Sequence, residues 1–106
     1  MINLGMNYSD DAVHWTGSVE GISSTTKISS TYKLETLNPN TNKYELLDTW
    51  PASTTKTFLI ASGDYTTGKG IFRLSVTTTV AANGIPETAS SSLTKTNASK
   101  KPLKVK

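Results

Sequence analysis

Few residues in this chain have the chemistry that catalysis or metal binding requires. His14 is the only histidine and cysteine is absent, so the three or four ligands of a zinc site are missing. Asp10 and Asp11 adjoin each other, but even with distant Asp64 they lack the spaced pattern of a calcium loop. The glutamates stand singly along the chain, so no carboxylate pair for glycoside hydrolysis is indicated. We therefore expect no enzyme activity, no metal and no cofactor.

The charge distribution limits the partners in the same way. The net charge is +3, and the excess comes from lysines crowded into residues 95–106. A nucleic-acid surface would need arginines and aromatic side chains on a folded face, so we expect no nucleic acid. No run is long and apolar enough to span a membrane. We interpret the lysine-rich end as a solvated tail, with contact to an anionic cell wall or lipid surface as the alternative.

A strand, a tight turn and a returning strand are predicted over residues 70–93, and the rest of the chain is organised around them. Apolar and polar residues alternate from Phe72 to Val80, which is the period of a half-buried strand. Asn83-Gly84 tolerates the positive φ that a two-residue type I′ turn demands. That turn would pair Ala82 with Ile85, Val80 with Glu87, Val76 with Ser91 and Leu74 with Leu93. Small Ala89 and Ser91 would then face inward under a bulky side chain, and Pro86 marks an edge strand.

The same alternation predicts further strands upstream. They cover residues 13–19, 26–37, 43–50 and 55–61, and a polar loop follows over 62–70. The segment 26–37 is either one long strand or two strands broken at Ser29-Ser30. Trp15 and Trp50 are expected in the core, and Pro51 should end the strand before it. The first residues carry Ile2, Leu4, Met6 and Tyr8 at spacing two. They predict either a first strand or an apolar arm that pairs with another chain.

Regular short strands between turns, without helical spacing, predict an all-β protein. We expect a single antiparallel β-sandwich of six to seven strands. The predicted organisation is an N-terminal arm or first strand (1–12), a sandwich (13–94) and a lysine-rich tail (95–106). Abundant serine and threonine, low charge and no cysteine are typical of a secreted or cell-surface β-sandwich.

Three strings carry a resemblance to a known fold family. They are Thr31-Tyr32-Lys33-Leu34-Glu35, Tyr44-Glu45-Leu46-Leu47, and the run from Gly70 to Val76. Together they resemble fibronectin type III and related immunoglobulin-like domains, which implies that kind of sandwich. Phe72 stands where the family has its usual aromatic residue, and it lacks the hydroxyl of a tyrosine corner. The chain is also similar to small uncharacterised proteins secreted by Gram-positive bacteria, which implies a compartment but no activity.

A second resemblance involves turns. The stretch Asn38-Pro39-Asn40-Thr41-Asn42 resembles the first loop of chagasin-like cysteine protease inhibitors, and residues 67–70 resemble their glycine-rich second loop. Asn83-Gly84 stands at the third, without its arginine and aromatic residue. This resemblance implies an inhibitor that presents loops at one end of the sandwich, whereas turn chemistry alone predicts an ordinary hairpin at 38–42.

The leading interpretation is a non-catalytic extracellular or cell-surface module for binding or structural assembly. Its loops or an exposed edge strand would contact a protein, a cell-surface glycan or a second copy. The candidate binding residues are Asn38, Asn40, Asn42, Asp64, Tyr65, Lys69, Asn83 and Gly84. The candidate assembly arm consists of Ile2, Leu4, Met6 and Tyr8.

Overall fold

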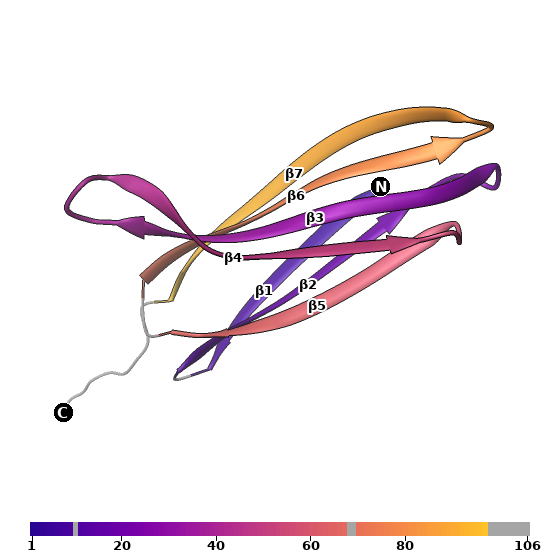
Figure 1. Cartoon of the computed structure of the whole chain (residues 1–106). Helices are drawn as coiled ribbons and strands as arrows, with labels where there is room; N and C mark the ends of the chain where they lie inside the picture. Colours follow the sequence, from indigo (N-terminus) through magenta and orange to yellow (C-terminus); the bar gives the residue numbers. More distant parts are fainter. Residues whose placement is uncertain (10, 68–69, 98–106) are drawn as a thin grey trace.

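Seven β-strands make up the part of the chain that the structure, a computed structural model, describes: residues 1–9, 11–67 and 70–97. No helix occurs within those ranges. The strands are β1 (Ile2–Ser9), β2 (Ala12–Glu20), β3 (Thr25–Asn38), β4 (Lys43–Thr54), β5 (Phe58–Thr66), β6 (Gly70–Ala82) and β7 (Ile85–Asn97). They form two antiparallel sheets (Figure 1), which confirms the predicted all-β sandwich.

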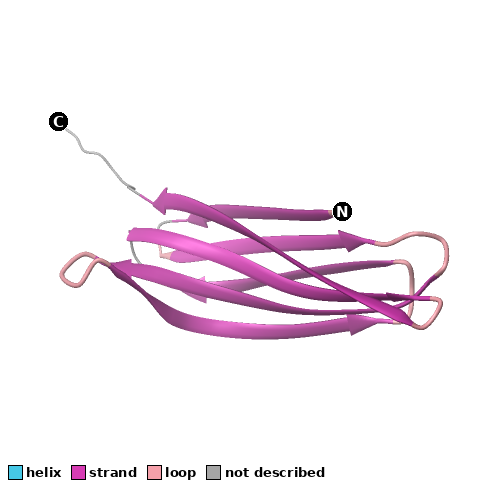
Figure 2. Cartoon of the chain, turned by 90° about the horizontal axis from the view of Figure 1, so that it is seen from above, coloured by secondary structure: helices cyan, strands magenta, loops and turns pink. Residues whose placement is uncertain are grey.

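The two sheets differ in width. One has three strands in the order β1-β2-β5, and the other has four in the order β4-β3-β6-β7. The strands run along the length of the molecule, which measures 59 × 27 × 17 Å (Figure 2). β1 and β7 are edge strands that contact each other on one side of the sandwich, and β4 and β5 do so on the other.

The β6–β7 hairpin forms as its sequence predicts. Asn83 and Gly84 have φ values of 53° and 78°, as a two-residue type I′ turn requires. The register pairs Ala82 with Ile85, Val80 with Glu87, Val76 with Ser91 and Leu74 with Leu93. The expected bulky cover over the returning strand is wrong, because Ala89 and Ser91 are exposed.

Two predicted strand ends are also wrong. β4 continues through Pro51 to Thr54, because an edge strand can carry a proline on its unpaired side. β5 continues to Thr66, although residues 62–70 were expected to form a loop. Gly63 does not mark a turn there, because it makes room for an aromatic ring: a Cβ at Gly63 would lie 2.5 Å from Trp15 Nε1.

The first and the last described strands do not follow the boundaries of the predicted organisation. β1 pairs with β2 over its whole length, so residues 2–9 are a first strand of this sheet. β7 continues to Asn97, so the predicted boundary between residues 94 and 95 falls inside a strand. Residues 98–106 of the lysine-rich tail lie outside the described residues.

Aromatic rings fill the middle of the core. Trp15 of β2 stacks on Tyr32 of β3 with ring centroids 4.7 Å apart, and both side chains are buried. Trp50 packs on the same indole at 5.0 Å but remains half-buried. Gly17 allows the tyrosine to approach β2, because a Cβ there would lie 2.3 Å from Tyr32 Cε1. The stack therefore joins the two sheets at a point where β2 and β5 both carry glycine.

Candidate functional site

A groove opens between the sheets near the β6–β7 turn. Its volume is about 730 Å³, and β1, the end of β2 and the β6–β7 hairpin line it. Eight of its lining residues are apolar: Met1, Ile2, Val19, Ile22, Val80, Ala82, Ile85 and Ala89. Met1, Ile22 and Ile85 are among the most exposed large apolar residues of the described chain. Apolar surface gathered in a hollow marks an interaction site more often than scattered exposed residues do.

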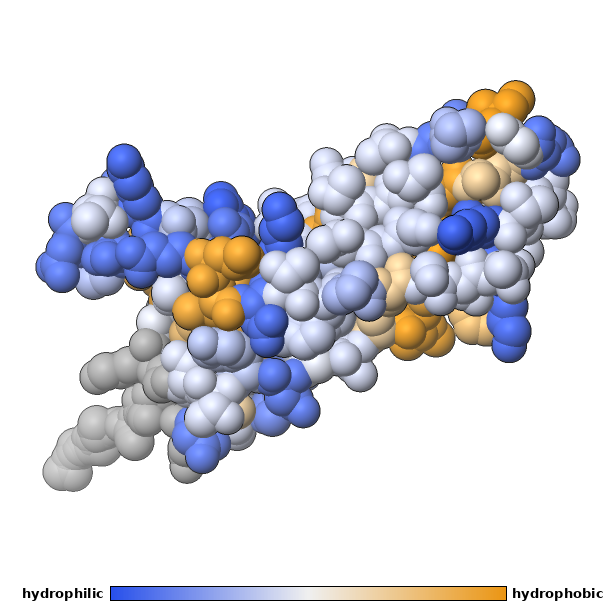
Figure 3. All heavy atoms as spheres, in the orientation of Figure 1, coloured by the Kyte–Doolittle hydropathy of each residue, from blue (hydrophilic) through white to orange (hydrophobic). Residues whose placement is uncertain are grey.

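On one wall of the groove, β7 presents inner-face side chains that no described strand of the opposite sheet covers. Ile85, Glu87 and Ala89 share that face by strand alternation, and all three are exposed. Figure 3 shows apolar residues emerging at separate places on a mainly polar surface. The four-stranded sheet therefore leaves part of its apolar side without a covering strand among the described residues.

The wall formed by β1 presents backbone groups as well as side chains. Met1 and Glu20 exchange two backbone hydrogen bonds, each of 2.8 Å. In an antiparallel ladder the next residue turns its N–H and C=O the other way, so those of Ile2 and Leu4 point away from β2. The Met6 carbonyl agrees with this alternation, because it accepts a 3.1 Å hydrogen bond from the Lys95 ammonium of β7. Lys95 thus closes the edge at Met6, and the edge is open at Ile2 and Leu4 among the described residues.

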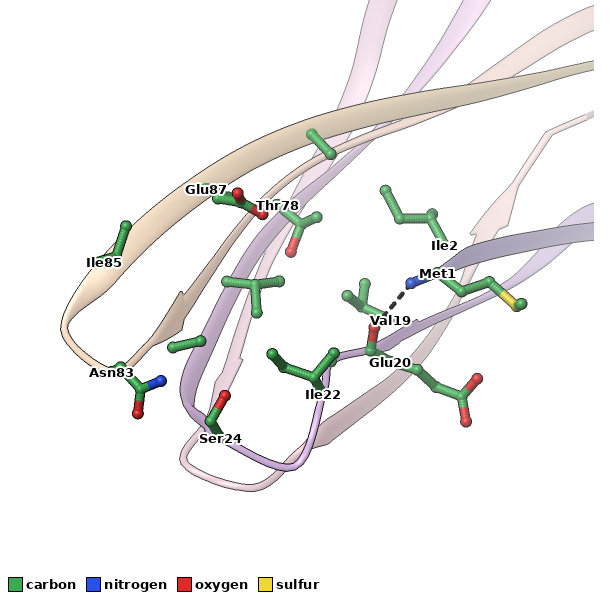
Figure 4. A pocket seen from close by; sticks show the side chains of 14 residues that line it. Met1, Ile2, Val19, Glu20, Ile22, Ser24, Thr78, Asn83, Ile85 and Glu87 are labelled. Atoms are coloured by element: carbon green, nitrogen blue, oxygen red, sulfur yellow. Dashed lines mark hydrogen bonds between the residues drawn. The ribbon is translucent and has the colours of Figure 1, made fainter.

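The charged groups around the groove are the Met1 ammonium and the carboxylates of Glu20 and Glu87. Figure 4 shows the Glu87 side chain directed toward Thr78 inside the groove, whereas the Glu20 side chain points away from it. The Met1 amino group donates to the Glu20 carbonyl at the same end. The groove therefore combines an apolar floor, an open strand edge and two nearby carboxylates.

A second constellation lies on the outer face of the three-stranded sheet. His14 Nδ1 lies 2.5 Å from Asp64 Oδ1, and His14 Nε2 lies 3.1 Å from Ser9 Oγ. When Nδ1 donates to the carboxylate, Nε2 is left to accept the serine hydroxyl proton. The connectivity is that of a serine hydrolase triad. Sequence reasoning missed it because Asp64 is fifty residues from His14 and was expected in a loop.

The surroundings of this triad do not favour hydrolysis. The side chains of His14 and Asp64 are 46% and 73% exposed, whereas a triad aspartate works from a buried position. In water such a pair is screened and holds the imidazole only weakly. We therefore interpret Ser9, His14 and Asp64 as a polar network that joins three neighbouring strands. No group of three or more metal-ligating acid, histidine or cysteine side chains occurs in the described ranges.

The predicted binding loops do not form one surface. Thr36 pairs with Phe72 and Thr25 with Ala82, so the turn at 38–42 and the turn at Asn83-Gly84 lie at opposite ends of the sandwich (Figure 1). The Asn38 carboxamide accepts from the Asn40 N–H at 2.9 Å and donates to Glu45 at 3.1 Å. The Asn38 side chain therefore stabilises the turn to which it belongs.

The remaining predicted loop residues lie in different surroundings. Asp64 and Tyr65 lie on β5, where Asp64 faces outward toward His14 and Tyr65 packs partly buried against the core. Asn40, Asn42 and Gly84 are exposed. Lys69 lies outside the described residues.

The four residues of the predicted assembly arm lie on β1 and point into the sandwich. Met6 is buried, and Ile2, Leu4 and Tyr8 are half-buried. Tyr8 packs against Phe72 with ring centroids 5.9 Å apart, and burial raises the pKa of its phenol. These side chains therefore belong to the protein's own core, whereas no described strand pairs with the outward backbone groups of Ile2 and Leu4.

Neither the fold nor the groove by itself relates this chain to a known protein family. None of the described segments is a helix with the length and apolar character that a membrane crossing needs. Comparison of the chain with protein-family models, curated proteins and solved structures finds no match.

Proposed function

We propose that this protein is a non-catalytic module, secreted or displayed at the cell surface, that binds an extended protein segment by strand addition to β1. The observation that carries the proposal is the groove, where an open strand edge lies beside an uncovered apolar sheet face. In strand addition the backbone edge provides affinity, and pockets for alternate side chains provide specificity. The backbone of Ile2 and Leu4 would be the edge that provides affinity, and the apolar floor would hold the alternate side chains that provide specificity.

The proposed compartment and family relationship have their own support. Three strands facing four, with β6–β7 as an edge hairpin, support a fibronectin-like or immunoglobulin-like sandwich. A chain rich in serine and threonine, poor in charge and free of cysteine supports secretion or surface display. Long sandwiches with exposed edges commonly act through those edges or through their end loops.

The geometry favours a protein segment over the other partners. A glycan-stacking surface would need an exposed tryptophan, but Trp15 is buried and Trp50 is half-buried. A chagasin-like inhibitor would need its three loops together, but the turn at Asn83-Gly84 lies at the end opposite the other two. Inhibition of a papain-like protease by the full chain would count for that alternative.

The test is selection of displayed random peptides on the full chain. Ile85→Lys places a charge in the groove at a side chain that is 67% exposed, so folding should be unaffected. Ile60→Lys is the matched control, because Ile60 is 70% exposed and lies on β5, outside the groove. Selected peptides should alternate apolar residues, bind the wild type and Ile60→Lys, and lose at least about tenfold in affinity for Ile85→Lys, which is about 1.4 kcal/mol.

Amide hydrogen exchange then distinguishes strand addition from simple apolar contact. Bound peptide should protect the N–H groups of Ile2 and Leu4, because those groups would donate to the added strand. Peptides that bind Ile85→Lys as well as the wild type, or that leave both amides unprotected, would contradict the proposed function.

A further inference from the structure

We propose that β5 is the contact surface of a two-fold symmetric dimer, in which the β5 strands of two copies pair antiparallel with Ile60 opposite Ile60. The three-stranded sheets of the two copies would then join into one continuous sheet. None of the residues that line the groove belongs to β5, so this contact leaves the proposed peptide site free.

β5 is the least protected of the sheet edges. Natural sheets block their edges with prolines, with lysines or with a covering element. β4 carries Pro51, β7 carries Pro86, and the Lys95 ammonium occupies the Met6 carbonyl of β1. β5 contains neither proline nor lysine, and no described strand pairs with its outer edge beside β2 (Figure 1). An edge strand of this kind is a template for pairing with another chain.

The backbone of β5 shows which residues face that edge. At the two ends of the β2–β5 ladder, the Gly21 N–H donates to the Thr57 carbonyl at 2.8 Å, and the Thr67 N–H donates to the Asp11 carbonyl at 2.9 Å. Because backbone groups alternate sides along a strand, the even-numbered residues of β5 turn their N–H and C=O groups away from β2. All of these residues also have exposed side chains: Phe58, Ile60, Ser62, Asp64 and Thr66.

The exposed apolar residues favour an axis at Ile60. In a two-fold symmetric contact the same patch of both copies must complement itself. This axis sets Ile60 against its own copy and Phe58 opposite Ser62, and the three residue pairs would exchange about six backbone hydrogen bonds. Ile60 and Phe58 are 70% and 49% exposed. Diagonal neighbours remain within reach across paired strands, so both side chains of both copies would form one apolar cluster.

The charges select the same axis. It sets Lys56, just before β5, opposite Asp64 of the second copy, twice by symmetry. Neither ion pair of the described residues involves Lys56, and His14 contacts only Oδ1 of Asp64, which leaves Oδ2 for the lysine. An axis at Leu59 would lose this charge pair, and an axis at Asp64 would oppose two carboxylates, which is destabilising.

The first test measures mass in solution by size-exclusion chromatography with light scattering. The wild type should form a concentration-dependent dimer. Ile60→Lys would oppose two ammonium groups at the axis, so its dissociation constant should be at least about tenfold higher. Ile85→Lys is the matched control, because Ile85 is 67% exposed but lies in the groove, and it should dimerise like the wild type.

Three outcomes of this measurement would overturn the proposal. They are a wild type that stays monomeric at every concentration, an Ile60→Lys variant that dimerises as tightly as the wild type, and a dimer that Ile85→Lys abolishes. None of them decides peptide binding at the groove, which Ile60→Lys should retain as a monomer.

A charge exchange tests the pairing of Lys56 with Asp64. Lys56→Asp and Asp64→Lys each set like charges together at both symmetric pairs, so each homodimer should be weaker than the wild type. In a mixture, the aspartate introduced at position 56 faces the lysine introduced at position 64, and the two native residues face each other. The mixture should therefore form heterodimers. A mixture that associates no better than either variant alone would overturn this register.

Single cysteines test the axis itself, because the chain contains no cysteine of its own. Ile60→Cys would face its own copy with Cα atoms about 5.5 Å apart, as in a hydrogen-bonded antiparallel pair. This separation lies within the span of a disulfide. Mild oxidation should therefore cross-link Ile60→Cys faster than Ser62→Cys, which would face Phe58 of the second copy. Equal rates for the two variants would overturn the placement of the axis at Ile60.

Discussion

Gly17→Ala should destabilise the fold strongly because of one ring beside it. A Cβ at this position would lie 2.3 Å from Tyr32 Cε1. Two carbon atoms in ordinary van der Waals contact are about 3.5 Å apart, so this distance is too short by about 1 Å. Tyr32 is fully buried and stacked on Trp15 at 4.7 Å, so its ring has little room to withdraw. Overpacking of this kind costs about 1–3 kcal/mol. The 2.3 Å approach to a fixed ring places the cost at the upper end of that range, about 3 kcal/mol. Removing a glycine from a strand returns about 0.5–1 kcal/mol, so the net loss should be about 2 kcal/mol.

The assay is urea unfolding followed by tryptophan fluorescence, since Trp15 reports directly on the stack. For a domain of this size the loss corresponds to a fall in Tm of roughly 8–16 °C. Gly5→Ala is the matched control: its Cβ would meet only the Thr16 hydroxyl at 2.8 Å, and this exposed side chain can rotate away. A Gly17→Ala variant as stable as Gly5→Ala would refute the claim that close approach of β2 to Tyr32 holds the sheets together.

Three further predictions concern polar groups. Tyr32→Phe should be neutral or stabilising by up to about 1 kcal/mol in urea unfolding, because the buried phenol approaches Ser30 but makes no hydrogen bond of good geometry among the described residues. A loss above about 1 kcal/mol would show that its contact with Ser30 is a stabilising hydrogen bond. Burial raises the pKa of both Tyr8 and Tyr32 above 10.0, so the folded state binds their protons more tightly than the unfolded state does. The stability that depends on these protons is full below pH 10 and falls as the pH rises above it, and the double phenylalanine variant should flatten that decline. His14→Ala should lower the free energy of unfolding by at most about 1 kcal/mol, because the contact of His14 with Asp64 is exposed. The wild type should hydrolyse p-nitrophenyl acetate no faster than free imidazole does. Faster hydrolysis that is lost in His14→Ala would show that the triad is catalytic.

Local pattern predicts the four-stranded sheet better than the three-stranded one. The β6–β7 hairpin carries its register in two adjacent residues, Asn83 and Gly84, so the pairing of both strands could be written down in advance. The predicted strand ended too early at residue 61, because residues 62–70, with Gly63 among them, were expected to form a polar loop. The actual role of Gly63 is to admit the Trp15 indole, which depends on a strand far away in the sequence.

The candidate sites could be predicted only in part. The alternation of Ile2 with Leu4 indicated a strand capable of pairing, and β1 is such a strand, whose outer edge no described strand pairs at those residues. The groove beside it was not predicted, because the inward small residues of β7 were expected to be covered. Ser9, His14 and Asp64 come from three strands, and only the pairing of β2 with both neighbours brings them together.

Sequence alone decided the fold class and the hairpin, because alternation, turn residues and composition act over a few neighbouring positions. Tertiary structure decided which strands share a sheet, where the aromatic stack joins the sheets and where they separate. These depend on contacts between side chains distant in the sequence, such as Trp15 with Tyr32 and Lys95 with Met6. The groove results from that packing: Lys95 closes the β1 edge at Met6, while none of the described strands covers the small inward residues of β7 at the far end.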